Sequence, residues 1–366
     1  MESDFYLESI KFLAKTKRMS TYDLVNSHDA FLNLLPKKLY KYRKSGDKGY
    51  PEFYVKQRKI YTASFNNLGD KFEGVTPASV NRVLKSDPKS LCVYYKVTII
   101  EIIKSRFPTL NFDNANFIFD TILNENFHIN KIYKNIKDLV QEQYRKELRN
   151  VVSAFVYLFE SLQEKTEGDE QFQKGLKMLM DTNNLMGAFC MCETYKNDTL
   201  WANYADNFQG YCVEYDLTEP FRSRGSYRFV TNLYPVVYVE KRDDDWFKPL
   251  FEMTIKTIDK NGKANRELSG LLFNHWMIKM LCTKKKIWDH EYEWRALGKA
   301  NGTYLGPLVS AVIVGHEINK TDFEQISSYC KKNKFPMKIT DIDYEKQEVI
   351  IRDITHADLE LIQKRN

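Results

Sequence analysis

The spacing of hydrophobic side chains divides the first half of the chain into predicted helices and strands. Residues 1–36 have apolar side chains at three- and four-residue intervals, so we predict N-terminal helices that end at Pro36. Apolar and polar side chains alternate over 38–43 and again over 59–64, which is typical of half-buried strands. Helical spacing returns over 78–182 and predicts a helical insertion.

The second half of the chain is richer in predicted strands. Alternation and an enrichment in aromatic and β-branched residues predict strands at 185–192, 210–216, 227–241, 292–298, 308–314, 337–341 and 347–352. Helical spacing predicts helices at 198–208, 246–286 and 321–332. Because strands and helices do not alternate regularly, we expect an α+β fold with a central, mostly antiparallel sheet. The expected organisation is a single α+β domain over 37–366 that carries the helical insertion.

Composition indicates a packed globular protein and restricts its partners only mildly. Of 366 residues, 43% are hydrophobic, and 23 tyrosines and 23 phenylalanines supply ample side chains for a core. The net charge of +6 comes from 55 basic and 49 acidic residues, so a nucleotide or nucleic-acid partner is permitted but not required. The six cysteines are scattered, which favours free thiols in a reducing compartment. The sequence has no apolar run of about 18 residues and no signal-like segment, so we expect a cytoplasmic protein without a membrane span.

Several common catalytic motifs are absent from the sequence. It has no G-x-G-x-x-G and no G-x-x-x-x-G-K, which argues against a Rossmann dehydrogenase and a P-loop NTPase. It also has no G-x-S-x-G nucleophile elbow. The six histidines show no metal-ligand spacing and Cys190-x-Cys192 lacks a second pair, so no metal cofactor is expected.

The segment 287–297, IWDHEYEWRAL, has the most distinctive charge pattern. Glu291 and Glu293 are two residues apart, so on a strand both carboxylates project from one face. Two such charges raise each other's pKa unless a cation compensates, and Arg295 lies on the same face. The alternative is that both glutamates lie on the exposed face of an edge strand, paired with Lys284–Lys286 or Arg295 and worth about 0–1 kcal/mol.

A series of motifs resembles a bacterial family known as domain of unknown function 2971. The motifs are KLYKYR followed by IYTASFNNLGDKFEG, then LWANYAD with GYCVEYD, KKKIWDHEYEWR and AVIVG, and they span about residues 38–330. The chain departs from the family pattern at Leu68, Gly69, Lys71 and Leu200. The family name implies no activity, but its members are often discussed in genome neighbourhoods linked to anti-phage defence or stress. The resemblance therefore implies a role of that kind.

The order of residue types is also similar to that of ADP-ribosyltransferases, which use NAD. Their pattern places an Arg or His on a first strand, a Ser or Tyr on a second, and Glu-x-Glu or a lone Glu on a later strand. The similarity implies that Arg43 or Lys41 contacts the NAD phosphates or ribose. It further implies that Ser64 and Tyr61 position the nicotinamide ribose.

In this interpretation the two glutamates carry the chemistry. Glu293 stabilises an oxocarbenium-like transition state, and Glu291 orients or deprotonates the acceptor. The other candidate binding residues are Tyr42, Asp70, Glu73, Trp201, Tyr204 and Arg295. Structural alternatives stay open for several of them: Asp70 closes an Asx-type turn, and Trp201 and Tyr204 pack a helix against a strand.

These patterns together predict an ADP-ribosyltransferase-like or NAD-cleaving enzyme, with NAD as substrate and a protein or nucleic acid permitted as acceptor. Two alternatives stay open. A metal-dependent nuclease requires Glu214 and Asp216 to join Glu291 and Glu293 in one acidic centre near Lys284–Lys286. A non-catalytic module that binds a nucleotide or a partner protein requires only the fold.

Overall fold

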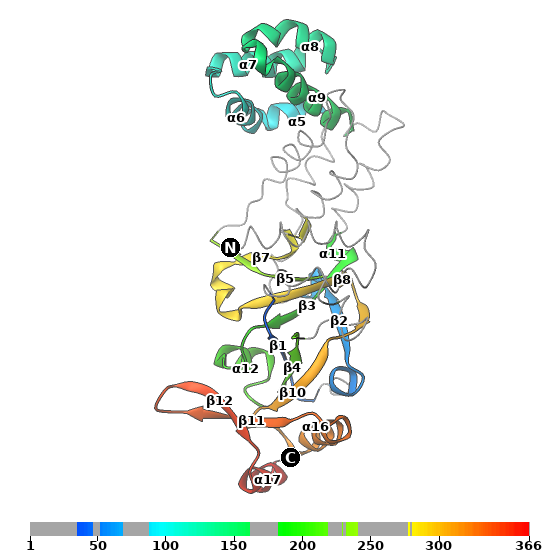
Figure 1. Cartoon of the computed structure of the whole chain (residues 1–366), viewed down its shortest axis with the longest axis vertical. Helices are drawn as coiled ribbons and strands as arrows, with labels where there is room; N and C mark the ends of the chain where they lie inside the picture. Colours follow the sequence, from blue (N-terminus) through cyan, green and yellow to red (C-terminus); the bar gives the residue numbers. More distant parts are fainter. Residues whose placement is uncertain are drawn as a thin grey trace. The chain divides into compact units, whose positions relative to one another are not determined.

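The chain forms two compact units (Figure 1), one from residues 1–74, 183–242 and 279–366, and the other from 75–182 and 243–278. The structure, a computed structural model, describes residues 35–46, 52–68, 88–161, 182–218, 229, 232–240, 277–278 and 280–365. Nearly all of the helices predicted over 1–36 and over 246–286 lie outside the described residues, as do Asp70 and Glu73. The prediction of a single domain with an insertion stays a prediction.

The first unit is built on a large, twisted sheet (Figure 1). Neighbouring strands follow the order β12-β11-β10-β4-β1-β3-β2-β9, and β8 pairs with both β3 and β5. β10 pairs in parallel with β11, and β6 with β7, whereas the other described pairs are antiparallel. The strands are β1 (Lys38–Arg43), β2 (Lys59–Ser64), β3 (Met186–Cys192), β4 (Tyr211–Asp216), β5 (Leu233–Pro235), β6 (Val237–Val239), β7 (Thr283–Lys285), β8 (Glu293–Lys299), β9 (Gly302–Leu305), β10 (Leu308–Val314), β11 (Met337–Asp343) and β12 (Glu348–Asp353). The predicted α+β fold with a mostly antiparallel sheet is confirmed.

Strand positions mostly agree with the alternating pattern, but β7, β9 and the last helix differ from it, and β9 forms at residues where no strand is predicted. β1 and β2 occupy the predicted ranges, because their alternate side chains meet the core and the solvent. β7 is a three-residue strand where helical spacing predicts a helix, so that prediction is wrong at 283–285. The last helix, α17 (His356–Gln363), follows the final predicted strand and is not predicted. Its signal is a capping box between Thr355 and Asp358.

Short helices connect the strands. They are η1 (Glu52–Lys56), η2 (Phe65–Asn67), α11 (Thr182–Leu185), α12 (Asp198–Tyr204), η5 (Lys286–Glu291) and α16 (Lys320–Asn333). α12 begins where the side chain of Asn197 accepts a hydrogen bond from the backbone N–H of Leu200 at 3.1 Å. After this helix the chain reaches Gly210, where an added Cβ would lie 2.0 Å from the carbonyl oxygen of Arg43. A glycine is therefore required for β4 to start beside the end of β1.

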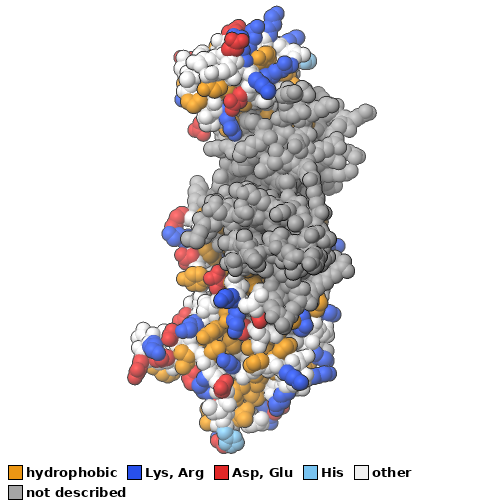
Figure 2. All heavy atoms as spheres, viewed as in Figure 1, with side chains coloured by type: hydrophobic (Ala, Val, Ile, Leu, Met, Phe, Trp, Pro, Cys, Tyr) orange, Lys and Arg blue, Asp and Glu red, His pale blue; other side chains and the backbone are white. Residues whose placement is uncertain are grey.

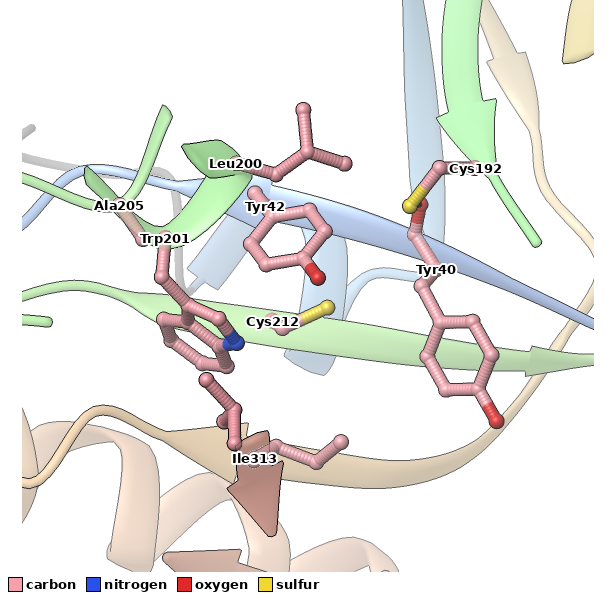
Figure 3. Close-up of a cluster of buried hydrophobic side chains, with 9 residues drawn as sticks. Tyr40, Tyr42, Cys192, Leu200, Trp201, Ala205, Cys212 and Ile313 are labelled. Atoms are coloured by element: carbon pink, nitrogen blue, oxygen red, sulfur yellow. Dashed lines mark hydrogen bonds between the residues drawn. The ribbon is translucent and has the colours of Figure 1, made fainter. Parts of the chain in front are cut away.

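One hydrophobic cluster fixes α12 against the sheet (Figure 3). Trp201 is fully buried, and its ring meets the ring of Tyr42 edge to face at a centroid distance of 5.0 Å. The indole Nε1 donates to the carbonyl oxygen of Tyr195 at 2.7 Å, so its polar atom is satisfied. Truncating a buried Trp to Ala typically costs about 3–5 kcal/mol. The cluster therefore holds β1 in place beneath the helix.

The sheet opens between two of its central strands. β1 pairs with β3 at a single position, Tyr40 with Cys192. Beyond it, β1 continues along β4 up to Arg43, whereas β3 continues along β8 and β2. The side chain of Lys41 reaches into the opening, where its Nζ donates to the carbonyl oxygen of Cys190 at 2.6 Å. The lysine side chain thus connects β1 to the backbone of β3 across the opening.

The described part of the second unit is helical (Figure 1). Its helices are α5 (Pro88–Tyr94), α6 (Lys96–Arg106), α7 (Phe112–Asn124), α8 (Ile129–Ile136) and α9 (Arg145–Ser161), with 3-10 turns η3 (Lys137–Leu139) and η4 (Glu142–Tyr144). Helices therefore form where helical spacing predicts them over 88–161. Among the residues that the structure describes, no helix has the length and apolar character that a membrane span requires. On the face drawn in Figure 2, basic and acidic side chains of both units are interspersed, as the near-balanced charge predicts.

Candidate active site

A cavity of about 320 Å³ lies where β1 and β3 separate. From β1 it receives Lys41 and Arg43, and its other charged side chains come from β7, η5 and β8. Those are Lys284, Glu291 and Glu293. Because β3 lies between β1 and β8 in the sheet, the cavity receives Lys41 and Arg43 from one side of β3, and Glu291, Glu293 and Lys284 from the other.

Glu293 is held by two cations at the start of β8. Its Oε1 accepts from Nε of Arg295 at 2.8 Å, and its Oε2 accepts from Nζ of Lys284 at 3.1 Å. Arg295 is fully buried, and Glu293 is 6% exposed. Arg295 also donates to the carbonyl oxygen of Leu281, so the guanidinium is fixed behind the glutamate. The network is rigid and largely removed from water.

Glu291 belongs to the same network, but its backbone conformation differs from the strand that the sequence predicts. It ends the 3-10 helix η5, and Tyr292 has a left-handed backbone with φ of 43° before β8 begins at Glu293. The expectation of two glutamates on one strand face is therefore wrong, because only Glu293 is in the strand. Even so, Lys284 Nζ donates to Oε2 of Glu291 at 2.6 Å, and Tyr204 donates its hydroxyl to Oε1 at 2.9 Å.

The alternative of an exposed edge strand is also wrong. β8 is flanked by β3 and β5 rather than lying at an edge. Glu291 is 5% exposed, and its partner Lys284 is also 5% exposed. The pairing with Lys284 and Arg295 that this alternative named is present, but it is buried. Screening by solvent is consequently weak, and each contact is electrostatically strong.

The surroundings shift the pKa values of Glu291 and Glu293 in opposite directions. For Glu293, burial raises the pKa, but Arg295 and Lys284 outweigh burial and hold the pKa well below its usual range. For Glu291, burial raises the pKa above its usual value, and the opposing effect of Lys284 does not cancel it. Glu293 therefore stays ionised, whereas Glu291 exchanges a proton more readily. Two carboxyl groups with separated pKa values are a recurrent arrangement in acid–base catalysis.

The β1 end of the cavity is positively charged and aromatic. The guanidinium of Arg43 lies 4.2 Å from the ring centroid of Tyr54 and donates to the Tyr54 hydroxyl. Lys41 Nζ lies 5.2 Å from the ring centroid of Phe189. Burial first and the charge of Arg43 second lower the pKa of Lys41 to about 8. Arg43 is thus the permanent cation of this end.

The sequence-predicted site residues separate into those that line the cavity and those that do not. Lining residues among them are Lys41, Tyr42, Arg43, Tyr61, Tyr204, Glu291 and Glu293. The Tyr61 hydroxyl donates to Asn301 Oδ1 at 2.6 Å, which fixes the ring at the cavity. Asp70 and Glu73 lie outside the described residues.

Three predicted binding residues are not among the lining residues. Ser64 is buried and caps η2, where its Oγ accepts from the N–H of Asn66 at 3.3 Å. Trp201 is in the core cluster, which is the packing alternative stated above. Arg295 is buried behind Glu293. These side chains support the site rather than facing its interior.

Lys284, Trp288 and Tyr54 are site residues that the sequence does not single out. Lys284 Nζ lies 4.9 Å from the ring centroid of Trp288, four residues further on, and bonds both glutamates. The basic run 284–286 is a weak signal, because it does not reveal which lysine is buried. In β7 only Lys284 points inward. Tyr54 is in η1, which lies between the strands predicted at 38–43 and 59–64.

The acidic centre required by the nuclease alternative does not form in the described residues. Glu214 accepts from Lys38 at 2.7 Å, Tyr40 at 3.1 Å and Ser310 at 2.7 Å, and it is not among the cavity's lining residues. Asp216 instead accepts from Thr218. Across the described parts of the chain, no group of three or more His, Cys, Asp or Glu is placed to hold a metal ion.

Fold and site together define an α+β protein with a buried ion network in an opened antiparallel sheet. Residues 200–296 match the family model described as Protein of unknown function (DUF2971). The matched segment contains α12, β4, η5 and the start of β8, and so includes Tyr204, Lys284, Glu291, Glu293 and Arg295. The resemblance to this family is confirmed over those residues. No curated protein and no solved structure matches the chain.

Proposed function

We propose that the cavity binds NAD and cleaves its bond to nicotinamide, as an NAD-cleaving or ADP-ribosyltransferase-like enzyme. The observation that supports this proposal is the distribution of charge in one cavity. Arg43 and Lys41 come from β1, and Glu291 and Glu293 come from η5 and β8. NAD in its oxidised form carries an anionic pyrophosphate and a cationic pyridinium ring. The β1 end suits the first group and the β8 end suits the second.

The cavity volume limits how much of the dinucleotide enters. Sites for small molecules usually measure about 300–1,000 Å³. At about 320 Å³ the cavity suits the nicotinamide ribose and the adjoining phosphate, with the adenosine outside it. Rings of Tyr54, Phe189 and Trp288 line this space and supply apolar contact for the base.

The two glutamates have separate parts in the proposed reaction. When the C–N glycosidic bond breaks, its electron pair leaves with nicotinamide and the ribose becomes an oxocarbenium-like cation. Glu293, kept ionised by Arg295 and Lys284, stabilises that positive charge. Glu291, with its raised pKa, accepts the proton of the attacking water or acceptor hydroxyl.

The cellular part of the proposal rests on the cysteines and on the family resemblance. The six cysteines form no disulfide, as in proteins of a reducing compartment, so we place the enzyme in the cytoplasm. A role in bacterial defence or stress is a prediction from the family resemblance. The acceptor, whether water, protein or nucleic acid, is part of what the assay below determines.

Nicotinamide release from NAD tests the proposal. Purified protein is incubated with NAD, and products are separated by chromatography. We expect free nicotinamide from the wild type and none above background from Glu293→Gln. Glu214→Gln is the matched control, because Glu214 is an equally buried glutamate of the same sheet outside the cavity, and it should keep the activity. Absence of nicotinamide from folded wild-type protein would contradict the proposal.

Binding without turnover is a second candidate, and one observation favours it. Both oxygens of Glu293 already accept hydrogen bonds from Arg295 and Lys284, as in a purely structural ion network. Calorimetric NAD binding with no nicotinamide release would support this candidate. Cutting of DNA or RNA that requires Mg²⁺, without NAD turnover, would instead support the nuclease.

A further inference from the structure

We infer that Lys41 is a nucleophilic amine that forms a Schiff base with a phosphate-bearing aldehyde. This inference goes beyond the proposed function, since it assigns a covalent step to a lysine that the proposed function uses only as a cation for phosphate. It concerns the β1 end of the cavity and not the glutamates.

The position of Lys41 is unusual for a lysine. Its side chain lines the cavity at the opening between β1 and β3, with Nζ held by the carbonyl oxygen of Cys190 at 2.6 Å. The Phe189 ring lies beneath it, at 5.2 Å from Nζ to the centroid. None of the ion pairs identified between described residues involves Lys41, whereas Lys284 bonds two carboxylates. The amine is therefore positioned by a neutral acceptor beside open space.

The charged and titratable groups around Lys41 favour its neutral form. Burial contributes most to lowering the pKa of Lys41 to about 8, followed by the guanidinium of Arg43 on the same strand. Cys190 and Cys192 from β3 and Glu293 from β8 act in the opposite direction but do not cancel these effects. Glu293 is paired with Arg295 and Lys284, and no ion pair identified between described residues joins it to Lys41. A neutral amine is the form that attacks carbonyl carbon.

Arg43 determines the chemical class of the partner. It follows Lys41 by two residues on the same strand and lines the same cavity, so both side chains project from one face of β1. A guanidinium suits a phosphate group through paired N–H donors. An aldehyde that carries a phosphate can therefore place its anion at Arg43 and its carbonyl carbon at Lys41. Open-chain sugar phosphates belong to this class.

The covalent step is a condensation without oxidation or reduction. The lone pair of the Lys41 nitrogen forms a bond to the aldehyde carbon. The carbonyl oxygen then leaves as water, together with the two hydrogens of the amine. The product is an imine between Nζ and the former aldehyde carbon. No oxidant, reductant or metal takes part.

Pyridoxal 5′-phosphate followed by borohydride provides the test, because borohydride makes the imine permanent and peptide mass spectrometry then locates it. At pH 8 a lysine with a pKa near 8 has a neutral fraction roughly 100-fold larger than an ordinary lysine. We expect Lys41 to be labelled at least tenfold faster than exposed lysines such as Lys38, with a rate that levels off above pH 8 to 9. Pyridoxal, which lacks the phosphate, should label Lys41 at least tenfold more slowly.

Two variants control the experiment. Lys41→Arg keeps the charge but should lose the fast label, whereas Lys38→Arg, on the same strand but outside the cavity, should keep it. If Lys41→Arg does not fold, the labelled site and pH profile of the wild type decide the question. Equal labelling of Lys41 and exposed lysines, or a Lys41 rate still rising at pH 10, would overturn the inference. Equal rates with pyridoxal would overturn the assignment to phosphates. The result does not depend on nicotinamide release.

Discussion

Two ion networks in the first unit have similar composition and opposite surroundings. In the C-terminal network, Arg352 bonds Asp341 at 2.6 Å and Asp358 at 2.6 and 2.9 Å. In the cavity network, Lys284 and Arg295 bond Glu291 and Glu293 at 2.6–3.2 Å. Arg352 is about one-third exposed, whereas Arg295 has no exposed surface.

The two networks differ in what they do for the fold. Asp358 belongs to the capping box of α17, so the C-terminal network joins a helix start to β11 and β12. The cavity network caps no helix, but it links β7, which among the described strands pairs only with β6 in a separate sheet, to η5 and to the start of β8. Burying its four charges costs desolvation that ion pairing only partly offsets. We therefore propose a functional role for the costly buried network beside the cavity, whereas stability explains the more exposed network at the cap.

The largest expected effect is that of Glu293→Gln. It removes the carboxylate that bonds the fully buried Arg295, while Lys284 keeps only Glu291, so we expect about 3–5 kcal/mol lower free energy of unfolding. We also expect nicotinamide release to fall about 10³-fold. Urea unfolding and the chromatographic assay measure the two effects. If this variant kept both the stability and the activity of the wild type, the cavity network would have no role that the C-terminal network lacks.

Glu291→Gln should affect activity and spare stability. Lys284 keeps Glu293 as a partner, and burial disfavours the charge of Glu291 in any case. We expect about 10²-fold slower nicotinamide release, because general-base assistance is lost. The free energy of unfolding at pH 7 should stay within about 1 kcal/mol of the wild type. A large loss of stability with unchanged activity would assign Glu291 a structural role.

Arg43→Gln should weaken binding without slowing the chemical step. Losing a charge-assisted hydrogen bond to phosphate costs about 1.5–3 kcal/mol, so we expect KM for NAD to rise at least about tenfold with kcat within about twofold. Arg352→Gln is the matched control from the C-terminal network and should leave both constants unchanged. A fall in kcat alone for Arg43→Gln would contradict the assignment of Arg43 to the phosphates.

Asp358→Asn tests the C-terminal network. The change weakens the capping box and removes the charge opposite Arg352, so we expect a loss of about 1–2 kcal/mol in the free energy of unfolding. Nicotinamide release should be unchanged. A loss comparable to that of Glu293→Gln would show that exposure does not distinguish the two networks.

The smallest effect is in the pH dependence of stability, and it has opposite signs in the two networks. Arg352 and the cap at Thr355 lower the pKa of Asp358, so the stability that Asp358 contributes is present above about pH 4 and is lost as pH falls. Burial raises the pKa of Glu291, so its folded form keeps a proton above about pH 4.3, and the wild type loses stability relative to Glu291→Gln as pH rises. Urea unfolding from pH 3 to 8 measures both differences. If the contributions of Asp358 and Glu291 to the free energy of unfolding changed with pH in the same direction, the assigned pKa shifts would be contradicted.

The sheet was largely predictable because alternation reports directly which side chains meet the core. β1, β2 and β10 have the predicted bounds for this reason. β7 was not predictable, because three residues carry too little periodicity and Lys284 looks polar whether it is buried or exposed. The opening between β1 and β3 depends on where pairing stops, which no local pattern encodes.

The site was predictable in its residue types more than in its geometry. The Glu-x-Glu pattern correctly predicted two carboxylates close together. They do not share a strand face, however, because the backbone at Tyr292 is left-handed and only Glu293 is in the strand. Ser64 and Trp201 show the limit of assigning roles by residue type, since a serine also caps helices and a tryptophan also fills cores. Only the packed structure distinguishes these uses.

The central claim is that one cavity presents the cations of β1 at one end and the ionised carboxylate of Glu293 at the other to a single ligand. Calorimetric titration of Glu291→Gln, in which turnover is slow, with the oxidised and reduced forms of NAD tests it most directly. Both forms carry the same phosphates, but only the oxidised form carries the positive ring that Glu293 attracts. We expect the oxidised form to bind at least about tenfold more tightly, a difference of about 1.4 kcal/mol. Equal affinities, or no binding of either form to the folded protein, would contradict the account.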